Sequence, residues 1–64
     1  MNIIQKESFV LYCKEDDTYL GISNMWTKCI EDARKFVYIE LAEYNKNEYE
    51  NVEIKKLKVT YILE

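Results

Sequence analysis

The amino-acid sequence predicts one α+β domain over residues 1–64, in which a three-stranded antiparallel sheet of order β-β-α-β carries one helix on one face. Three patterns predict this fold. Two runs rich in β-branched and aromatic residues flank an acidic turn, a middle segment repeats apolar residues at helical spacing, and the last run alternates apolar and polar residues. Because a chain of 64 residues is too short to build a second core, we expect a single domain.

The first two strands form a predicted β-hairpin. Residues 8–14 and 18–23 are the two strand-forming runs. The Glu-Asp-Asp sequence at 15–17 supplies the turn, because aspartate side chains bond nearby backbone groups. Residues 2–5 extend the first strand in this interpretation. Gly21 indicates a bulge or a close backbone approach in the second strand.

The middle segment predicts a helix from residue 28 to about Asn45, with Thr27 as its N-cap. Apolar residues recur there at three- and four-residue spacing, which places them on one stripe of a helix. We expect this stripe to face the sheet. It consists of Ile30, Ala33, Val37, Leu41 and Tyr44.

A second set of apolar residues in the same segment conflicts with that stripe. In one straight helix Phe36, Ile39 and Ala42 would project from the opposite side. One interpretation is that the helix breaks near Phe36–Ile39, a run of weaker helix formers, so that Phe36 turns inward. The other is that the helix is continuous, and that Phe36, Tyr38 and Ile39 form an exposed patch that binds a partner protein or a second copy.

The last run, residues 51–63, predicts a long third strand. Its alternation slips by one residue at Lys55 and Lys56, so we expect a β-bulge there. With Lys58 these lysines form a basic strip, which suggests a nucleic-acid-binding regulator that also uses aromatic stacking. The net charge of −3 argues against non-specific nucleic-acid binding, and edge strands carry lysine to discourage edge-to-edge pairing.

Residues for catalysis are scarce in this chain. It contains no histidine, no glycine-rich phosphate loop and only two cysteines, Cys13 and Cys29, which we expect to be buried thiols and not a bridge. Cys29 falls early in the predicted helix, where the helix dipole lowers a thiol pKa, but it lacks a histidine partner. The sequence therefore predicts a protein that is not an enzyme and that binds no metal or cofactor.

The acidic turn has two interpretations. Glu15, Asp16 and Asp17 form either an ordinary solvated surface or part of an acidic face that occupies a nucleic-acid-binding groove on a target protein. No run is long enough to span a membrane, and the first residues lack the features of a signal peptide. We expect a small acidic cytoplasmic protein that binds a protein partner and makes no membrane contact. The sequence does not decide whether it forms a homodimer.

One run of the sequence resembles a known group of proteins. Residues 19–27 read Tyr-Leu-Gly-Ile-Ser-Asn-Met-Trp-Thr and are followed by Ile30, Asp32-Ala33 and Phe36. This pattern is similar to that of small phage and prophage proteins of low-GC Gram-positive bacteria. The resemblance implies an inhibitor that acts in host takeover or against host defence, as anti-CRISPR proteins do, by occluding a host protein in the host cytoplasm.

Overall fold

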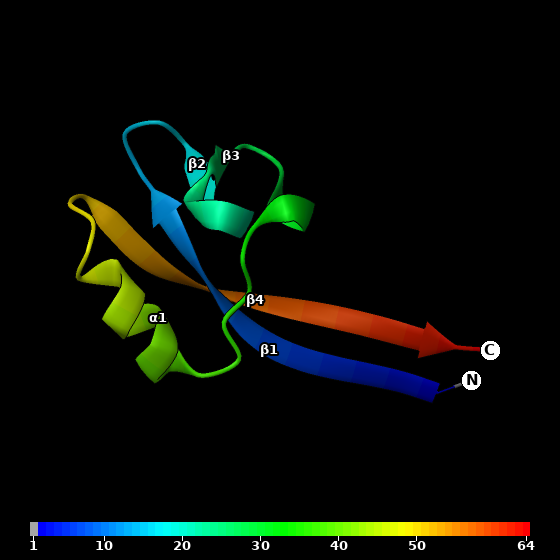
Figure 1. Ribbon diagram of the computed structural model, residues 1–64. Helices are drawn as coiled ribbons and strands as arrows, with labels where there is room; N and C mark the ends of the chain where they lie inside the picture. Colours follow the sequence, from blue (N-terminus) through cyan, green and yellow to red (C-terminus); the bar gives the residue numbers. More distant parts are fainter. Residues whose placement is uncertain (1) are drawn as a thin grey trace.

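A computed structural model describes residues 2–64 and shows an α+β fold (Figure 1). Its antiparallel sheet has four strands in the order β3-β2-β1-β4. The strands are β1 (Asn2–Cys13), β2 (Thr18–Leu20), β3 (Trp26–Thr27) and β4 (Val52–Leu63). The α-helix is α1 (Ile39–Lys46), and two 3-10 turns are η1 (Ile22–Asn24) and η2 (Ile30–Asp32). The predicted α+β class is confirmed, whereas the two-residue strand β3 was not predicted.

Strands β1 and β4 form one long antiparallel ribbon. Their register runs without interruption from Asn2 opposite Leu63 to Cys13 opposite Val52. The predicted extension of the first strand is confirmed, and the bulge predicted at Lys55 and Lys56 is wrong. No bulge is needed, because the ribbon has apolar neighbours on both faces where it crosses the body. The apolar residues of β4 therefore lie on one face at Val52 and Ile54 and on the other face from Leu57 onward.

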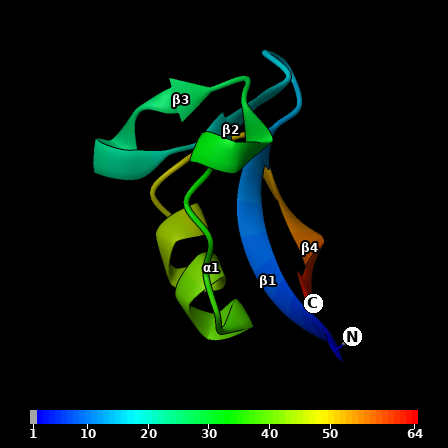
Figure 2. The ribbon, with the colours of Figure 1, turned by 90° about the vertical axis from the view of Figure 1, so that its right-hand side faces the viewer.

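The two faces of this ribbon have different environments. Leu11 and its cross-strand neighbour Ile54 lie on the face that carries α1, within the main core. Figure 2 shows α1 on one side of the β1–β4 ribbon. We call the other side the open face. Its side chains include Ile4, Val10, Leu57, Val59, Tyr61 and Leu63.

The segment between β3 and α1 is mostly extended, so the helix predicted from residue 28 is wrong in its first half. Phe36 pairs with Phe9 through two backbone hydrogen bonds of 2.8 Å, one in each direction. The edge of β1 thus satisfies the backbone groups that a helix would otherwise pair internally. No α-helix begins at Thr27 either, although its hydroxyl accepts a hydrogen bond from the Cys29 N–H at 3.1 Å.

Gly21 is a point of close backbone approach, as predicted. Its N–H donates to the carbonyl of Met25 at 2.6 Å, and a Cβ built on it would lie only 2.8 Å from that same oxygen. Any side chain here would force the two backbone segments apart. Gly21 also bridges Ala33, so it fixes where the extended segment crosses the end of β2.

The main core is small and lies between α1 and the sheet. It contains Leu11, Leu20, Phe36, Ala42 and Val52. Ala42 is fully buried where α1 meets the sheet. None of the helices within residues 2–64 has the length and apolar composition needed to cross a membrane.

Candidate interaction surface

The acidic turn is held by hydrogen bonds within the chain. The hydroxyl of Tyr12 donates to Asp17 Oδ1 at 2.7 Å, and the Asn51 side-chain amide donates to Glu15 Oε1 at 3.2 Å. The Cys13 thiol donates a long bond of 3.9 Å to Asp16. Each of the three carboxylates therefore has a role in ordering the turn.

Asp17 perturbs Tyr12. The hydrogen bond to the Asp17 carboxylate, followed by desolvation and the negative charge of Asp17, raises the pKa of Tyr12 to about 12. Asp17 has a positive φ of 55°, a conformation that aspartate tolerates better than most residues. The turn is thus built around this pair.

The residues predicted around Phe36 separate into core and surface. Phe36 is only 5% exposed and packs in the main core, so the predicted inward turn is confirmed and the continuous helix is wrong. Tyr38 and Ile39 are 65% and 40% exposed. The acidic turn and the start of α1 lie at opposite ends of the body (Figures 1 and 2), so the structure does not bring the six predicted partner-binding residues together.

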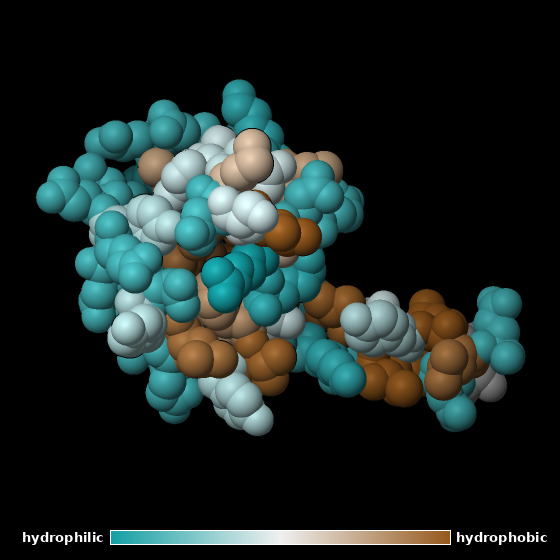
Figure 3. All heavy atoms as spheres, in the orientation of Figure 1, coloured by the Kyte–Doolittle hydropathy of each residue, from teal (hydrophilic) through white to brown (hydrophobic). Residues whose placement is uncertain are grey.

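Large apolar residues that were predicted to face the sheet are exposed on α1 and just before it. Val37, Leu41 and Tyr44 are 68%, 51% and 72% exposed. Together with Tyr38 they form a surface that we call the helix patch. Leu41 lies in the middle of it, three residues after Tyr38 and three before Tyr44, which places them on adjacent turns. In Figure 3 brown, hydrophobic atoms are exposed near the start of α1.

The prediction that the stripe faces the sheet is wrong for Val37, Leu41 and Tyr44, whose size favours a core position, whereas Ala33 of the same stripe is buried as predicted. The sheet already supplies bulky residues there, Leu11 and Phe36, so α1 approaches it closely through small Ala42. Ala42 is the small residue on the side opposite the predicted stripe. Its small size was the signal in the sequence that this side could approach the sheet closely.

A second exposed apolar surface lies where the ribbon leaves the body. We call residues 2–8 of β1 and 57–63 of β4 the arm, which projects from the body in Figures 1 and 3. Its open face carries Ile4, Tyr61 and Leu63, which are 42%, 52% and 54% exposed. The sequence prediction missed this arm, because strand periodicity does not show whether anything covers a face.

The lysines of β4 do not form one basic strip. Lys55 points to the open face, 5.6 Å from the Tyr12 ring centre and 3.3 Å from a carboxylate oxygen of Glu53. Lys56 and Lys58 point to the opposite face, and Lys56 pairs with Glu7 at 3.0 Å. We therefore assign no nucleic-acid role to them.

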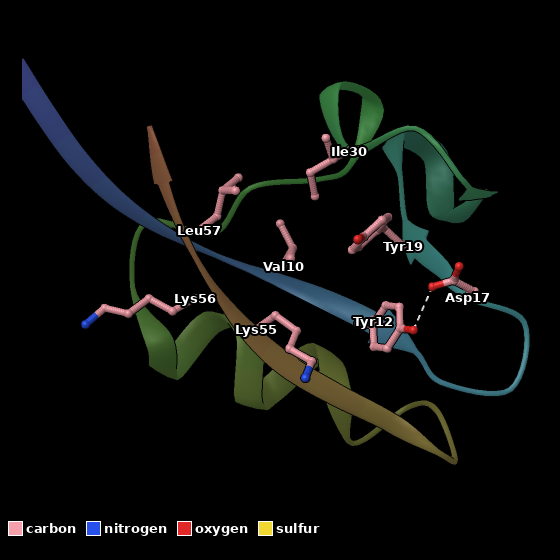
Figure 4. A pocket seen from close by; sticks show the side chains of 8 residues that line it. All are labelled: Val10, Tyr12, Asp17, Tyr19, Ile30, Lys55, Lys56 and Leu57. Atoms are coloured by element: carbon pink, nitrogen blue, oxygen red, sulfur yellow. Dashed lines mark hydrogen bonds between the residues drawn. The ribbon is translucent and has the colours of Figure 1, made fainter. Parts of the chain in front are cut away.

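The open face also forms a shallow groove of ≈ 490 Å³ in the body. Figure 4 shows Val10, Tyr19 and Ile30 pointing toward one another there, with Leu57 beside them and the Tyr12–Asp17 hydrogen bond at one end. Apolar side chains dominate its floor. The groove continues toward the arm through Leu57.

The cysteines are free, as predicted, but Cys29 is exposed and Cys13 is only half-buried, so the prediction of buried thiols is wrong for Cys29 and is not met in full by Cys13. The Cys29 thiol donates to Glu31 at 3.0 Å, and this bond and the carboxylate charge raise the pKa of Cys29 while the bond lowers the pKa of Glu31. A raised pKa is opposite to the activation predicted for a helix N-terminus. Across residues 2–64 the structure groups no three His, Cys, Asp or Glu side chains in a way that could hold a metal ion.

Comparison with known proteins found no match to a protein-family model, to a curated protein or to a solved structure.

Proposed function

We propose that this chain is a small non-enzymatic protein that binds another protein through the helix patch. The observation that carries the proposal is that α1 buries Ala42, while the four large apolar side chains of the helix patch, on α1 and just before it, are more than half exposed. Contiguous exposed apolar surface on a small protein is typical of an interaction site. Aromatic residues are enriched at such sites because they bury much area with few rotatable bonds.

The charges beside the helix patch indicate what kind of partner fits it. Glu40 and Glu43 are exposed on α1 next to the apolar residues. Rim charges of one sign guide a partner of the opposite sign and orient it on the apolar centre. The partner that fits is therefore a protein with an apolar pocket bordered by basic residues.

The resemblance to phage and prophage proteins extends this proposal. On that basis the partner is a host protein, in particular one of host defence, and the chain acts by occluding its working surface. Each of the carboxylates of Glu15, Asp16 and Asp17 accepts a hydrogen bond that orders the turn, and Glu15 lies beside Lys46 at the last turn of α1, away from the start of the helix. The acidic turn is accordingly left out of the proposed interface.

Affinity capture with matched variants tests the proposal. The wild-type chain should recover one partner protein from a bacterial lysate, and the double variant Leu41→Lys/Tyr44→Lys should lose it, because two buried lysines would oppose the basic partner. Glu50→Lys adds a lysine at an exposed position after α1 and should retain the partner. Recovery of the same proteins by all three chains would contradict the proposal, provided that the fluorescence of Trp26 shows the same folded body.

A further inference from the structure

The open face is covered by the chain in the body, where Val10 is only 1% exposed beside Tyr19 and Ile30. Beyond the body it continues through half-buried Leu57 and Val59 to an uncovered apolar surface in the arm. The α-helix packs on the other face (Figure 2). An antiparallel sheet with one apolar and one polar face ordinarily packs the apolar one against something.

Two of the three charged residues of the arm, Glu7 and Lys58, lie on the opposite face. Glu7 forms a 3.0 Å ion pair there with Lys56, which lies just outside the arm. On the open face of the arm the one charged residue is Lys6, opposite Val59. The opposite face also carries exposed Ile3 and Ile62, but the open face has the larger set of apolar residues and can enter a sheet-to-sheet contact without burying a cluster of like charges.

The excess exposed area of the chain is close to the area that one interface buries on each partner. The chain exposes 5129 Å², whereas a compact protein of 7.8 kDa exposes about 4,400 Å², an excess of about 700 Å². Its radius of gyration of 12.8 Å likewise exceeds the value of about 11 Å for a compact chain of this length. A standard interface removes about 800 Å² from each partner.

The molecule that covers the open face of the arm must be present whenever the arm is folded. A two-stranded ribbon without a covered face is marginally stable in water. A second copy of the chain is always available, and a two-fold axis brings the same patch against itself. We infer that two copies associate through the open faces of their arms into a symmetric dimer, in which the two apolar ribbons pack face to face.

The dimer goes beyond the proposed function and uses a different surface. The helix patch lies on the outer side of α1, on the face of the ribbon opposite the contact. Each dimer would present two copies of the helix patch. A partner that is itself oligomeric would then be bound with avidity, without any new contact.

Sedimentation equilibrium tests the dimer on three chains. At about 100 µM, far above the Kd expected of a standard-size contact, the wild type should have twice the 7.8-kDa mass of the chain. Tyr61→Lys places a charge in the apolar contact and should raise the dimer Kd at least about 30-fold. Thr60→Lys is the matched control, because this neighbouring side chain points to the opposite face of the same strand. A monomeric wild type, or equal weakening by both lysines, overturns the inference.

Folding of each variant is followed by Trp26. Its ring packs edge-on against Tyr49 in the body, with ring centres 5.4 Å apart, so its fluorescence does not depend on contacts in the arm. If Tyr61→Lys loses that signal, Ile4→Lys on the adjacent strand replaces it. The wild-type melting temperature should also rise with protein concentration if dimerisation stabilises the fold. A concentration-independent melting temperature would count against the dimer.

Pairing through the strand edge is the competing geometry. Phe9 directs both its backbone groups away from β4 to Phe36, so by alternation Gln5 also directs its N–H to the outer edge of β1. Within the described chain, residues 2–8 of β1 pair with β4 alone. Gln5→Pro removes that outward donor and leaves the β1–β4 bonds intact. A dimer lost in Gln5→Pro and kept in Tyr61→Lys would overturn face-to-face packing.

Discussion

Several polar side chains in this protein order the backbone around them. The acidic turn is the clearest case, because a carboxylate that accepts a phenol hydrogen bond also fixes where β1 ends and β2 begins. Asp17 contributes in two ways, by accepting from Tyr12 and by adopting a positive φ. The same residues that suggested an acidic binding face thus have a structural explanation.

The Tyr12–Asp17 pair makes a prediction for alkaline pH. Since the folded pKa of Tyr12 is raised from 10.0 to about 12, the stability that the pair contributes is fully present below pH 10 and is lost as pH rises through about 12. Asp17→Asn removes the charge and keeps a residue that tolerates positive φ, so the pKa of Tyr12 should fall toward 10. Carbon-13 NMR of the tyrosine rings measures this directly. Asp16→Asn should leave Tyr12 unchanged, and a wild-type Tyr12 that titrates at about 10 would contradict the geometry.

The helix α1 shows how an element can be predicted in the right region with the wrong bounds. Periodicity indicated a helix up to Asn45, and α1 runs from Ile39 to Lys46. The stretch before Ile39 is extended because Phe36 gains sheet hydrogen bonds and core burial that a helix at that place would deny it. Tertiary pairing thus prevailed over local propensity.

The start of α1 offers a test that separates stability from binding. Tyr38 occupies the N-cap position with extended backbone angles, but its side chain makes no capping hydrogen bond. Tyr38→Ser should be more stable than Tyr38→Ala by about 1 kcal/mol, because serine can accept from the first-turn N–H groups. Urea unfolding measured by Trp26 fluorescence compares the two.

The same pair of variants also tests the helix patch. Serine and alanine at position 38 both remove an aromatic ring that is 65% exposed, so both should weaken capture of the partner. If Tyr38→Ser gains stability while it loses binding, the ring serves the contact and not the fold. Unchanged capture would place the contact elsewhere.

The molecule as a whole has a small body and a projecting arm, with extents of 43 × 23 × 19 Å. Few side chains are fully buried, so each one carries a large share of the stability. Phe36, which is 5% exposed, is close to this and joins α1, β1 and the extended segment in one core. Chains of this size have roughly 3–5 kcal/mol of stability from a single core.

Truncation of neighbouring residues in the extended segment should therefore change the free energy of unfolding by very different amounts. Phe36→Ala should cost about 3–5 kcal/mol and leave the isolated chain largely unfolded. Val37→Ala, at an exposed position, should change the free energy of unfolding by less than about 0.5 kcal/mol. Ile39→Lys should also stay folded, since that side chain is 40% exposed. Thermal denaturation followed by circular dichroism gives these values, and a folded Phe36→Ala chain would show that the core is elsewhere.

Local sequence was sufficient for the α+β class, for the acidic turn and for the close approach at Gly21. These depend on side-chain chemistry and spacing within a few residues, which act before any long-range contact forms. The two interpretations of Phe36 could not be resolved at that level. Burial depends on which surface happens to lie opposite, and that surface comes from distant residues.

Only the tertiary structure decided which apolar side chains are core and which are surface. Both sides of the middle segment and both faces of the last strand carry large apolar residues, so periodicity alone could not rank them. The helix packs on the sheet through the side with Ala42. Bulky residues already fill the space between the two layers, so the helix can approach closely only where its own side chain is small. Val37, Leu41 and Tyr44 of the stripe predicted as core are exposed in the helix patch, whereas Ala33 is buried as predicted. The predicted bulge is instead a continuous strand whose far end projects as the arm.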